Sequence, residues 1–525
     1  MRSIGWMLAA ALALVAAPAA HAAPVTTEAG LVDGADVDGL IVYKGVPFAA
    51  PPVGPLRWRE PQPVTPWTDV RRAQDFAPAC MQTGVSMPGE TPPKVSEDCL
   101  YLNIWTPVRR PGARLPVMVW IHGGGFTNGS ASMPLYWGDR LAKRGVIVVT
   151  TAYRLGPLGF LAHPELTRES AHNSSGDYGL MDQIAALNWV KRNIAAFGGD
   201  PSRVTILGQS AGSTSVSLLM ASPAARGLFQ RAVGESGGGF EPIELAPGYL
   251  LPNAEKTGQA YAASLGATSI AALRGLPAAK LFNDQAGSVG HPVLDRDVLP
   301  MWPYQAFAEG RQNDVPLLLG SNAEEARSML DLDLSTIKAA TYQDDIRQRW
   351  GPLPEALFAT YPHATDVEAR QARAHFERDL RFGWDVWAWA RLQALTGRSR
   401  VFYYHFNQSP PFPPASVYAG WGPSHFAELW YVFDHLGQEP WAWTAADRRL
   451  ADLMATYWTN FAKTGDPNGP GAPVWPSFAP RGGPVLYLGD PVAVAGVADL
   501  ETLQTFDAVY DKLRGAPFGA QRPPP

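Results

Sequence analysis

The sequence predicts an α/β fold in which a mostly parallel central sheet carries helices on both faces. Continuous apolar runs, typical of buried strands, occur at residues 116–121, 146–151, 204–207 and 315–320. Residues 179–197 show helical periodicity between two of these runs. A strand, a Gly-x-Ser-x-Gly turn and a helix-compatible segment follow one another at residues 203–220. Such alternation is typical of a parallel sheet covered on both faces.

Size and composition agree with this fold and exclude some partners. The 525 residues suffice for one large α/β domain or for two or three ordinary ones. A net charge of -5 gives no basic footprint, so we expect no nucleic-acid partner. With 51 glycines and 49 prolines, the chain should contain many long, shaped loops.

Residues 1–23 are expected to form a signal peptide. Arg2 supplies the positive start, residues 7–17 an apolar core, and Ala20-His21-Ala22 an A-x-A cleavage site. The alternative is a buried N-terminal helix. No later stretch approaches ~20 uninterrupted apolar residues, so we expect no stable membrane span. Residues 24–525 should form the exported mature chain, in the periplasm or secreted.

The chain has two cysteines, Cys80 and Cys99, and both lie in the expected mature part. Export to an oxidising compartment favours one disulfide between them. It would close a loop of roughly 20 residues and contribute about 3 kcal/mol by the chain-entropy estimate. The alternative is a pair of buried free thiols.

The chain begins with a hairpin-like segment and a Pro- and Gly-rich loop within residues 24–65, and a strand follows at 101–105. The strand at 116–121 ends in His122-Gly123-Gly124-Gly125-Phe126. Consecutive glycines after a strand let backbone N–H groups converge, as an oxyanion hole requires. A flexible surface loop is the alternative.

After the strand at 146–151 we expect a loop over 152–178 and then the helix at 179–197. The next strand leads into Gly208-Gln209-Ser210-Ala211-Gly212. Strand, Gly-x-Ser-x-Gly and helix together form the context of a nucleophile elbow, in which glycines permit the tight turn. Ser210 then needs a base, a group that orients the base, and oxyanion donors.

A second Gly-x-Ser-x-Gly match occurs at residues 234–238, centred on Ser236. A strand-like run at 229–233 precedes it. Gly239 and Pro242 follow it, and they do not begin a continuous helix. We therefore predict Ser210, and not Ser236, as the nucleophile.

The strand at 315–320 is followed by Glu324 and Glu325, beyond its carboxyl end, where functional side chains of α/β sheets gather. Either carboxylate could orient a histidine. Residues 326–400 have helical spacing and predict a cap or gorge wall. Later elements are expected as a strand at 401–406, a loop before His425, a helix from Thr444 to about Lys463, a strand at 485–488 and a disordered tail.

With these residues in view, the chain resembles the type-B carboxylesterase and cholinesterase family of the α/β-hydrolase fold, and in particular bacterial para-nitrobenzyl esterase-like members. The matching stretches cover nearly all of the mature chain: YKGVPFAAPPVGPLRW, EDCLYLNIWTP, IHGGGF, GLMDQIAALNWVKRNIAAFGGDPSRVTILGQSAG, GSNAEE, SHFAELWYVF and WTNFAKTGDPN. They occur in the family's order and at similar spacings.

The resemblance implies a catalytic triad of Ser210, Glu325 and His425, in the chain order expected of an α/β-hydrolase. Glu325 matches the family's acid in its position after Asn322, and Glu324 is the neighbouring alternative. The resemblance also implies that Gly124, Gly125 and Ala211 donate to the oxyanion, and that Cys80 and Cys99 form the first family disulfide.

Two positions depart from the family pattern. Gln209 stands where most relatives have Glu, which weakens any inference of cationic, choline-like substrates. Ala326 stands at a usual glycine, and nothing in the sequence explains this change.

The expected function is hydrolysis of small-molecule carboxylic esters through an acyl-enzyme, without a metal or an organic cofactor. The alternatives are a lipase, a dedicated natural-product esterase, and a non-catalytic binding or adhesion domain. Trp421, Phe426 and the tryptophans of residues 384–389 suggest an aromatic gorge, or else belong to the core. The oligomeric state does not follow from the sequence.

Overall fold

The computed structural model describes residues 23–108, 112–328, 334–350, 353–480 and 482–520. Residues 1–22 of the predicted signal peptide and the last residues of the predicted disordered tail lie outside the described residues. The main sheet has 11 strands in the order β16-β15-β14-β13-β12-β11-β9-β10-β8-β4-β3. Their bounds are β3 Ala35–Val37, β4 Leu40–Pro47, β8 Tyr101–Thr106, β9 Leu115–Ile121, β10 Ile147–Thr151, β11 Gly199–Gln209, β12 Arg231–Glu235, β13 Leu317–Asn322, β14 Val401–Phe406, β15 Val485–Leu488 and β16 Ala493–Ala495.

The strands from β10 to β15 pair in parallel, and the antiparallel pairs lie at the two edges. The predicted mostly parallel sheet is therefore confirmed. The central strands read as continuous apolar runs because both of their faces are covered.

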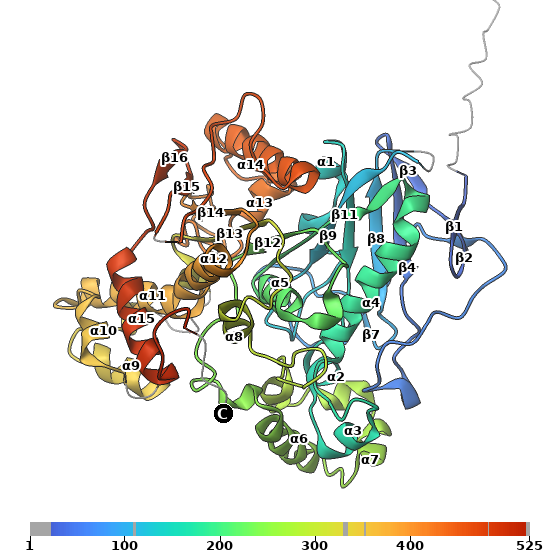
Figure 1. Ribbon diagram of the computed structural model, residues 1–525, viewed down its shortest axis with the longest axis horizontal. Coiled ribbons are helices and arrows are strands. Elements are labelled where there is room, and N and C mark those ends of the chain that lie inside the picture. Colours follow the sequence, from blue (N-terminus) through green and yellow to red (C-terminus); the bar gives the residue numbers. More distant parts are fainter. Residues whose placement is uncertain (1–22, 109–111, 329–333, 351–352, 481, 521–525) are drawn as a thin grey trace, which may run out of the picture.

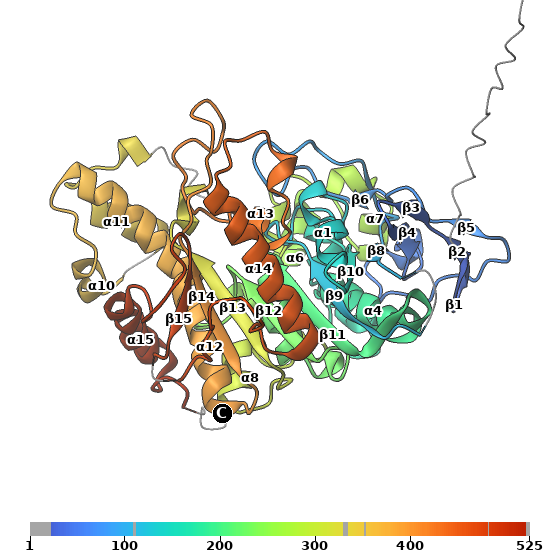
Figure 2. The same ribbon diagram turned by 90° about the horizontal axis from the view of Figure 1, so that it is seen from above.

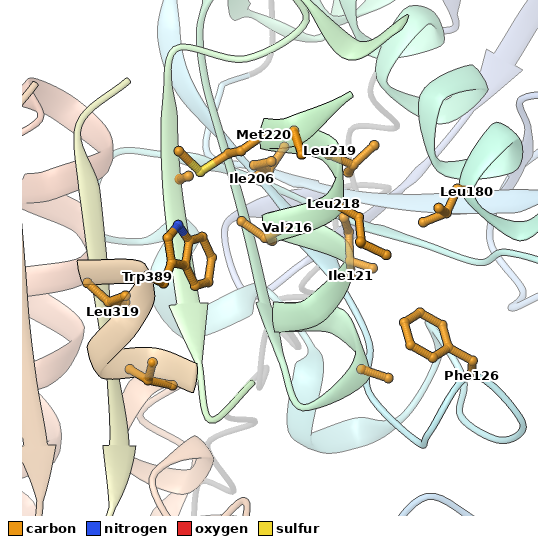
Figure 3. Close-up of a cluster of buried hydrophobic side chains, with 14 of the residues drawn as sticks. Ile121, Phe126, Leu180, Ile206, Val216, Leu218, Leu219, Met220, Leu319 and Trp389 are labelled. Carbon is orange, nitrogen blue, oxygen red and sulfur yellow. The ribbon is translucent and has the colours of Figure 1, made fainter. Parts of the chain in front are cut away.

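Helices cover the two faces of this sheet (Figures 1 and 2). One hydrophobic core lies between the sheet and a first group of helices, α4 Tyr178–Asn193, α5 Ala211–Ala221, α8 Pro303–Ala308 and α12 Trp384–Thr396. Figure 3 shows part of it, where Trp389 and Val216 meet the strand residues Ile206 and Leu319. A second core lies under α1 Asp139–Ala142, α13 Leu429–Val432 and α14 Ala445–Thr464.

A cap of helices lies at one end of the sheet, opposite the N-terminal strands (Figures 1 and 2). It comprises α9 Tyr342–Trp350, α10 Glu355–Ala359, α11 Asp366–Arg378, a π-helical turn at Asp379–Gly383, and α15 Leu500–Arg514. The helical cap predicted for residues 326–400 is confirmed for α9, α10, α11 and the π-helical turn, whereas residues 384–396 form α12, which packs on the sheet in the core. The elements β16 and α15 were not predicted from the sequence.

Other short elements complete the chain. The predicted loop at 152–178 is wrong in part, because it contains α2 Gly156–Phe160 and α3 Pro164–Glu169, each opened by a proline in its first turn. Helices of five or six residues show too little periodicity to be found from sequence. The remaining elements are α6 Leu251–Ser264, α7 Ile270–Arg274, β1 Val25–Thr27, β2 Gly30–Asp33, β5 Arg71–Arg72, β6 Ala79–Cys80 and β7 Val95–Ser96.

The predicted disulfide between Cys80 and Cys99 is present, with a Cα–Cα distance of 4.9 Å. Cys80 ends β6, which pairs with β7. Across the described ranges, we find no helix whose length and apolar character would let it cross a membrane.

Candidate active site

Ser210 stands between the end of β11 and the start of α5, with φ 58° and ψ -126°. This unusual conformation is held in place, since the Ser210 N–H donates to Glu235 O at 2.9 Å. A Cβ on Gly212 would lie 2.1 Å from Ile121 O, and one on Gly208 would lie 2.5 Å from the Gly212 carbonyl carbon. Only glycine fits at both positions, so the motif folds as the predicted elbow.

The glycine loop after β9 lies against the elbow. Gly124 has φ +106°, and a Cβ there would lie 2.2 Å from Asn128 O. Within the described ranges, the N–H groups of Gly124, Gly125 and Ala211 have no acceptor in the protein. Gly125 and Ala211 line one cavity together with Ser210. Unpaired donors beside a half-buried serine that lines a cavity are what an oxyanion requires.

His122 supports this loop. Its Nδ1 lies 2.8 Å from Gly123 O, its ring stacks on Tyr153 with centroids 4.5 Å apart, and Tyr153 Oη donates to His122 O at 2.9 Å. Burial lowers the pKa of His122 to about 4, so the ring is neutral near pH 7. These contacts give His122 a structural role in shaping the loop.

The structure brings Glu325 and His425 together. His425 Nδ1 lies 2.6 Å from Glu325 Oε2, and the N–H of Asn322 donates to Glu325 Oε1 at 2.7 Å. Glu325 is fully buried and His425 is 3% exposed. The carboxylate therefore fixes the imidazole with Nδ1 as donor, which leaves Nε2 to accept a proton.

Glu324, the alternative acid, contacts Arg327 and His375 and not His425. Its Oε2 accepts from Arg327 Nε at 2.6 Å, and its Oε1 lies 3.9 Å from His375. Burial raises the pKa of Glu324, but its interactions with His375 and Arg327 outweigh this effect and lower the pKa to about 2. Glu324 is thus an ion-pair partner, and of the two glutamates Glu325 is the one that contacts His425.

Both faces of the His425 ring are covered. The Phe382 ring stacks on it with centroids 4.6 Å apart. Gln209 Nε2 lies 3.2 Å from Nε2 and 3.4 Å from Nδ1 of the same ring. The two ring nitrogens flank one carbon, and an amide nitrogen this near to both could not lie in the ring plane without overlapping that carbon. Gln209 therefore lies over the ring face.

Ser210 Oγ makes no hydrogen bond to another protein atom of the described ranges. Catalytic hydrogen bonds are often long in a site without substrate and tighten when substrate binds. The structure thus brings together the acid and the base, and it places the half-buried serine and the donor loop in one cavity.

Two further carboxyl groups are buried behind the histidine. Glu235 accepts from Trp458 Nε1 at 2.7 Å, and Glu428 accepts from the side-chain amide of Asn322. Burial raises the pKa of Glu235 to about 8. Burial also raises the pKa of Glu428 well above its ordinary range, and the neighbouring Glu325 raises it further. Both groups hold their protons near neutral pH.

Ser236 does not share the cavity. It is fully buried, it directly follows β12, and the next residues form no helix. Its backbone N–H donates to Gly320 O at 2.9 Å, while its Oγ has no partner among the described residues. The second Gly-x-Ser-x-Gly match thus lacks the exposed tip that a nucleophile needs.

The cavity beside Ser210 has a volume of about 510 Å³. Its aromatic wall includes Phe126, Trp302, Trp350 and Phe382. The tryptophans of residues 384–389 are at most 2% exposed and belong to the core, so their assignment to a gorge is wrong. Trp421 and Phe426 also do not line this cavity.

Sequence reasoning missed part of the cavity wall. Glu241 and Asp385 line it, as do Phe506, Val509 and Tyr510 of α15. Apolar residues recur every three or four positions in α15, which was a usable signal for a helix, but nothing in the sequence indicates that this helix reaches the site. No cluster of three or more potential metal-ligating side chains occurs in the described ranges.

Comparisons with known proteins agree with this geometry. A family model described as the carboxylesterase family matches residues 21–504. The chain is 37% identical over 475 residues to the fumonisin B1 esterase of Sphingopyxis macrogoltabida, covering 87% of this chain and 84% of that protein. It is 36% identical over 501 residues to the para-nitrobenzyl esterase of Bacillus subtilis, covering 91% and 97%.

Solved structures give the same result. A PNB esterase superposes with a TM-score of 0.78 at 34% identity, covering 92% of this chain and 99% of that one. A carboxylesterase of Geobacillus stearothermophilus gives a TM-score of 0.78 at 32% identity, covering 91% and 98%. The chain therefore belongs to the carboxylesterase family, has the α/β-hydrolase fold of these neighbours, and is a carboxylic ester hydrolase.

Proposed function

We propose that ester hydrolysis proceeds through a triad of Ser210, His425 and Glu325. The observation that carries this proposal is the 2.6 Å contact between His425 Nδ1 and Glu325 Oε2 beside a serine held at a strained elbow. His425 removes the Ser210 proton as Oγ attacks the ester carbonyl carbon. Glu325 stabilises the imidazolium that forms.

The oxyanion of the tetrahedral intermediate accepts hydrogen bonds from the N–H groups of Gly124, Gly125 and Ala211. One such donor typically contributes about 3 kcal/mol of transition-state stabilisation. As the intermediate collapses, the alcohol leaves with the proton from His425. Water then attacks the acyl-enzyme, with His425 again as base, and releases the acid and free Ser210.

We propose a substrate bulkier than a simple short-chain ester. The cavity of about 510 Å³ supports this, because pockets of ~300–1,000 Å³ hold drug-sized ligands. The relatives include a fumonisin B1 esterase and a phenmedipham hydrolase. A dedicated natural-product esterase and a lipase remain the two alternatives. A purely binding role is disfavoured, because all three triad side chains are present.

The test is hydrolysis of p-nitrophenyl acetate, butyrate and octanoate by the wild type, Ser210→Ala and Ser236→Ala. We expect the wild type and Ser236→Ala to hydrolyse the esters and Ser210→Ala to lose this activity. Retained turnover in Ser210→Ala would refute the assigned nucleophile. A steep rise in kcat/KM up to octanoate would favour the lipase alternative, and a flat series would not.

We also propose that the protein is exported, to the periplasm or the medium, and that residues 24–525 act as one domain. The disulfide between Cys80 and Cys99 supports export, because disulfides persist in oxidising compartments. N-terminal sequencing of the protein from its native host tests this proposal. A mature chain that begins near residue 24 is expected, and an intact Met1 would contradict it.

A further inference from the structure

The cavity beside Ser210 holds two carboxyl groups that the proposed reaction does not use. Glu241, in the loop after β12, and Asp385, on α12, both line it. Asp385 is 5% exposed and accepts from the N–H of Phe240 at 3.2 Å. A side-chain hydrogen bond joins the two carboxyl groups. The fold thus assembles an acidic pair from distant parts of the chain.

Two carboxyl groups in direct contact share a proton, because both cannot ionise at once. Burial raises the pKa of Asp385 well above its ordinary range, and the charge of Glu241 raises it further. Burial also raises the pKa of Glu241, but its hydrogen bond with Asp385 opposes this. We assign the shared proton to Asp385, which is only 5% exposed, and the negative charge to Glu241, which is half-buried, because the ion is better solvated there.

No side-chain nitrogen of Lys, Arg or His lies within 4.0 Å of either carboxyl group in the ranges that the structure describes. Two basic side chains, Arg381 and His291, also line the cavity. Arg381 pairs with Glu377 at 2.9 Å, and burial lowers the pKa of His291, so that its ring is neutral. The charge on Glu241 has no adjacent counter-ion.

The Tyr510 hydroxyl independently indicates a polar ligand at this place. Tyr510 is 2% exposed and lines the same cavity, and its hydroxyl has no partner among the described residues. Both carboxyl groups are near enough to raise its pKa. A buried hydroxyl without a partner is unfavourable, and a ligand that hydrogen-bonds to it removes that cost.

We propose that Glu241, Asp385 and Tyr510 form a subsite for a protonated aliphatic amine carried by the ester substrate. The ammonium group would donate to the Glu241 carboxylate and to the Tyr510 hydroxyl oxygen. This inference deepens the proposed function and rests on it, because the subsite and Ser210 share one cavity.

The largest possible distance from the nucleophile limits the length of the substrate. A Cβ on Gly237 would lie 2.4 Å from Ser210 O, and a Cβ on the next residue, Gly238, would lie 3.3 Å from Asp385 Oδ2. Asp385 is therefore within roughly 12 Å of the Ser210 backbone, given 3.8 Å between neighbouring Cα atoms. An amine some six bonds from the ester carbonyl fits this span.

The test compares three p-nitrophenyl esters of similar length at pH 7: 6-aminohexanoate, heptanoate and adipate. Each rate is corrected for the reaction without enzyme. The informative quantity is the kcat/KM ratio of aminohexanoate to heptanoate, which does not depend on the fraction of folded protein. We expect this ratio to fall about tenfold in the double variant Glu241→Gln/Asp385→Asn, and severalfold in Tyr510→Phe.

Single and control variants sharpen the result. Asp385→Asn alone should keep the ratio, because Glu241 retains its charge and the amide can still donate to it. Glu244→Gln is the matched control for Glu241→Gln. It replaces a glutamate of the same loop that does not line this cavity, and it should leave the kcat/KM ratio and the activity unchanged.

Two results would overturn the subsite. One is an equal ratio in the wild type and the double variant, with both esters hydrolysed, which would leave the esterase mechanism intact. The other is a preference of the wild type for adipate over both other esters. That result would mean that the cavity binds the free carboxylate of adipate through Arg381. Hydrolysis of all three esters that persists in Ser210→Ala would instead refute the proposed function itself.

Discussion

At the scale of single residues, the contact between Glu325 and His425 is the most decisive feature of the site. Glu325→Gln keeps the size of the side chain, but its amide can donate to Nδ1 and so move the imidazole proton to Nε2. We expect kcat for p-nitrophenyl acetate to fall by roughly 10⁴-fold, as an Asp→Asn change in a serine-protease triad does. Steady-state kinetics measure this loss.

Glu324 provides a matched control for this change. It is the adjacent residue, yet its carboxylate binds Arg327 and does not contact His425. Glu324→Gln should therefore retain kcat within a fewfold of the wild type. If the two glutamine variants lost activity equally, the assignment of Glu325 as the acid would be wrong.

Gln209 is a second informative residue, because its amide lies over the His425 ring. A carboxylate in its place would stabilise the charged imidazolium, which cannot act as a base. Three other acidic groups lie near the ring. Glu325 is in direct contact with it, Glu428 contacts Asn322, and Glu235 lies near Glu428; burial keeps Glu428 and Glu235 protonated near neutral pH. Gln209→Glu should move the acid limb of the kcat/KM profile to higher pH, by about one unit.

The measurement is kcat/KM for p-nitrophenyl acetate between pH 5 and 9. Gln285→Glu adds the same charge at an exposed position and should leave the profile in place. An acid limb that coincides in Gln209→Glu and the wild type would show that the amide does not affect the protonation of His425.

At the scale of elements, the elements that local sequence specifies were predicted correctly. The elements that depend on tertiary contacts were not. The elbow is predictable because Gly208 and Gly212 meet backbone atoms at distances that exclude a Cβ. The helix after Thr444 is predictable because Thr444 and Asp447 form a capping box. Both patterns are complete within a few residues.

The elements that sequence reasoning missed depend on distant partners. α15 begins after Asp499, which has a left-handed φ of 50° and makes no side-chain cap, so the usual start signal is absent. The acidic pair of Glu241 and Asp385 joins residues 144 positions apart, and no local pattern predicts that contact. The cavity wall, and with it the substrate preference, is therefore harder to predict than the triad.

At the scale of the whole molecule, the buried Glu235 makes stability depend on pH. The folded protein keeps the Glu235 proton up to about pH 8, whereas the unfolded chain loses it near pH 4.5. The folded state thus binds more protons between these two values. Its free energy of unfolding must decrease as pH rises through that window, and the contribution is constant above about pH 8.

Glu235→Gln removes this titration while an amide oxygen can still accept from Trp458. Groups remote from Glu235 titrate alike in both proteins, so the difference in unfolding free energy between them reports Glu235 together with its neighbour Glu428, whose pKa it raises. We expect the variant to gain stability relative to the wild type from pH 5 to pH 8.5, at no more than ~1.4 kcal/mol per pH unit. Urea denaturation at a series of pH values measures this gain.

Glu501→Gln, at an exposed position, should show a constant difference. A constant difference in Glu235→Gln as well would mean that Glu235 is ionised in the folded protein. A buried negative charge would then lie near the catalytic base, His425.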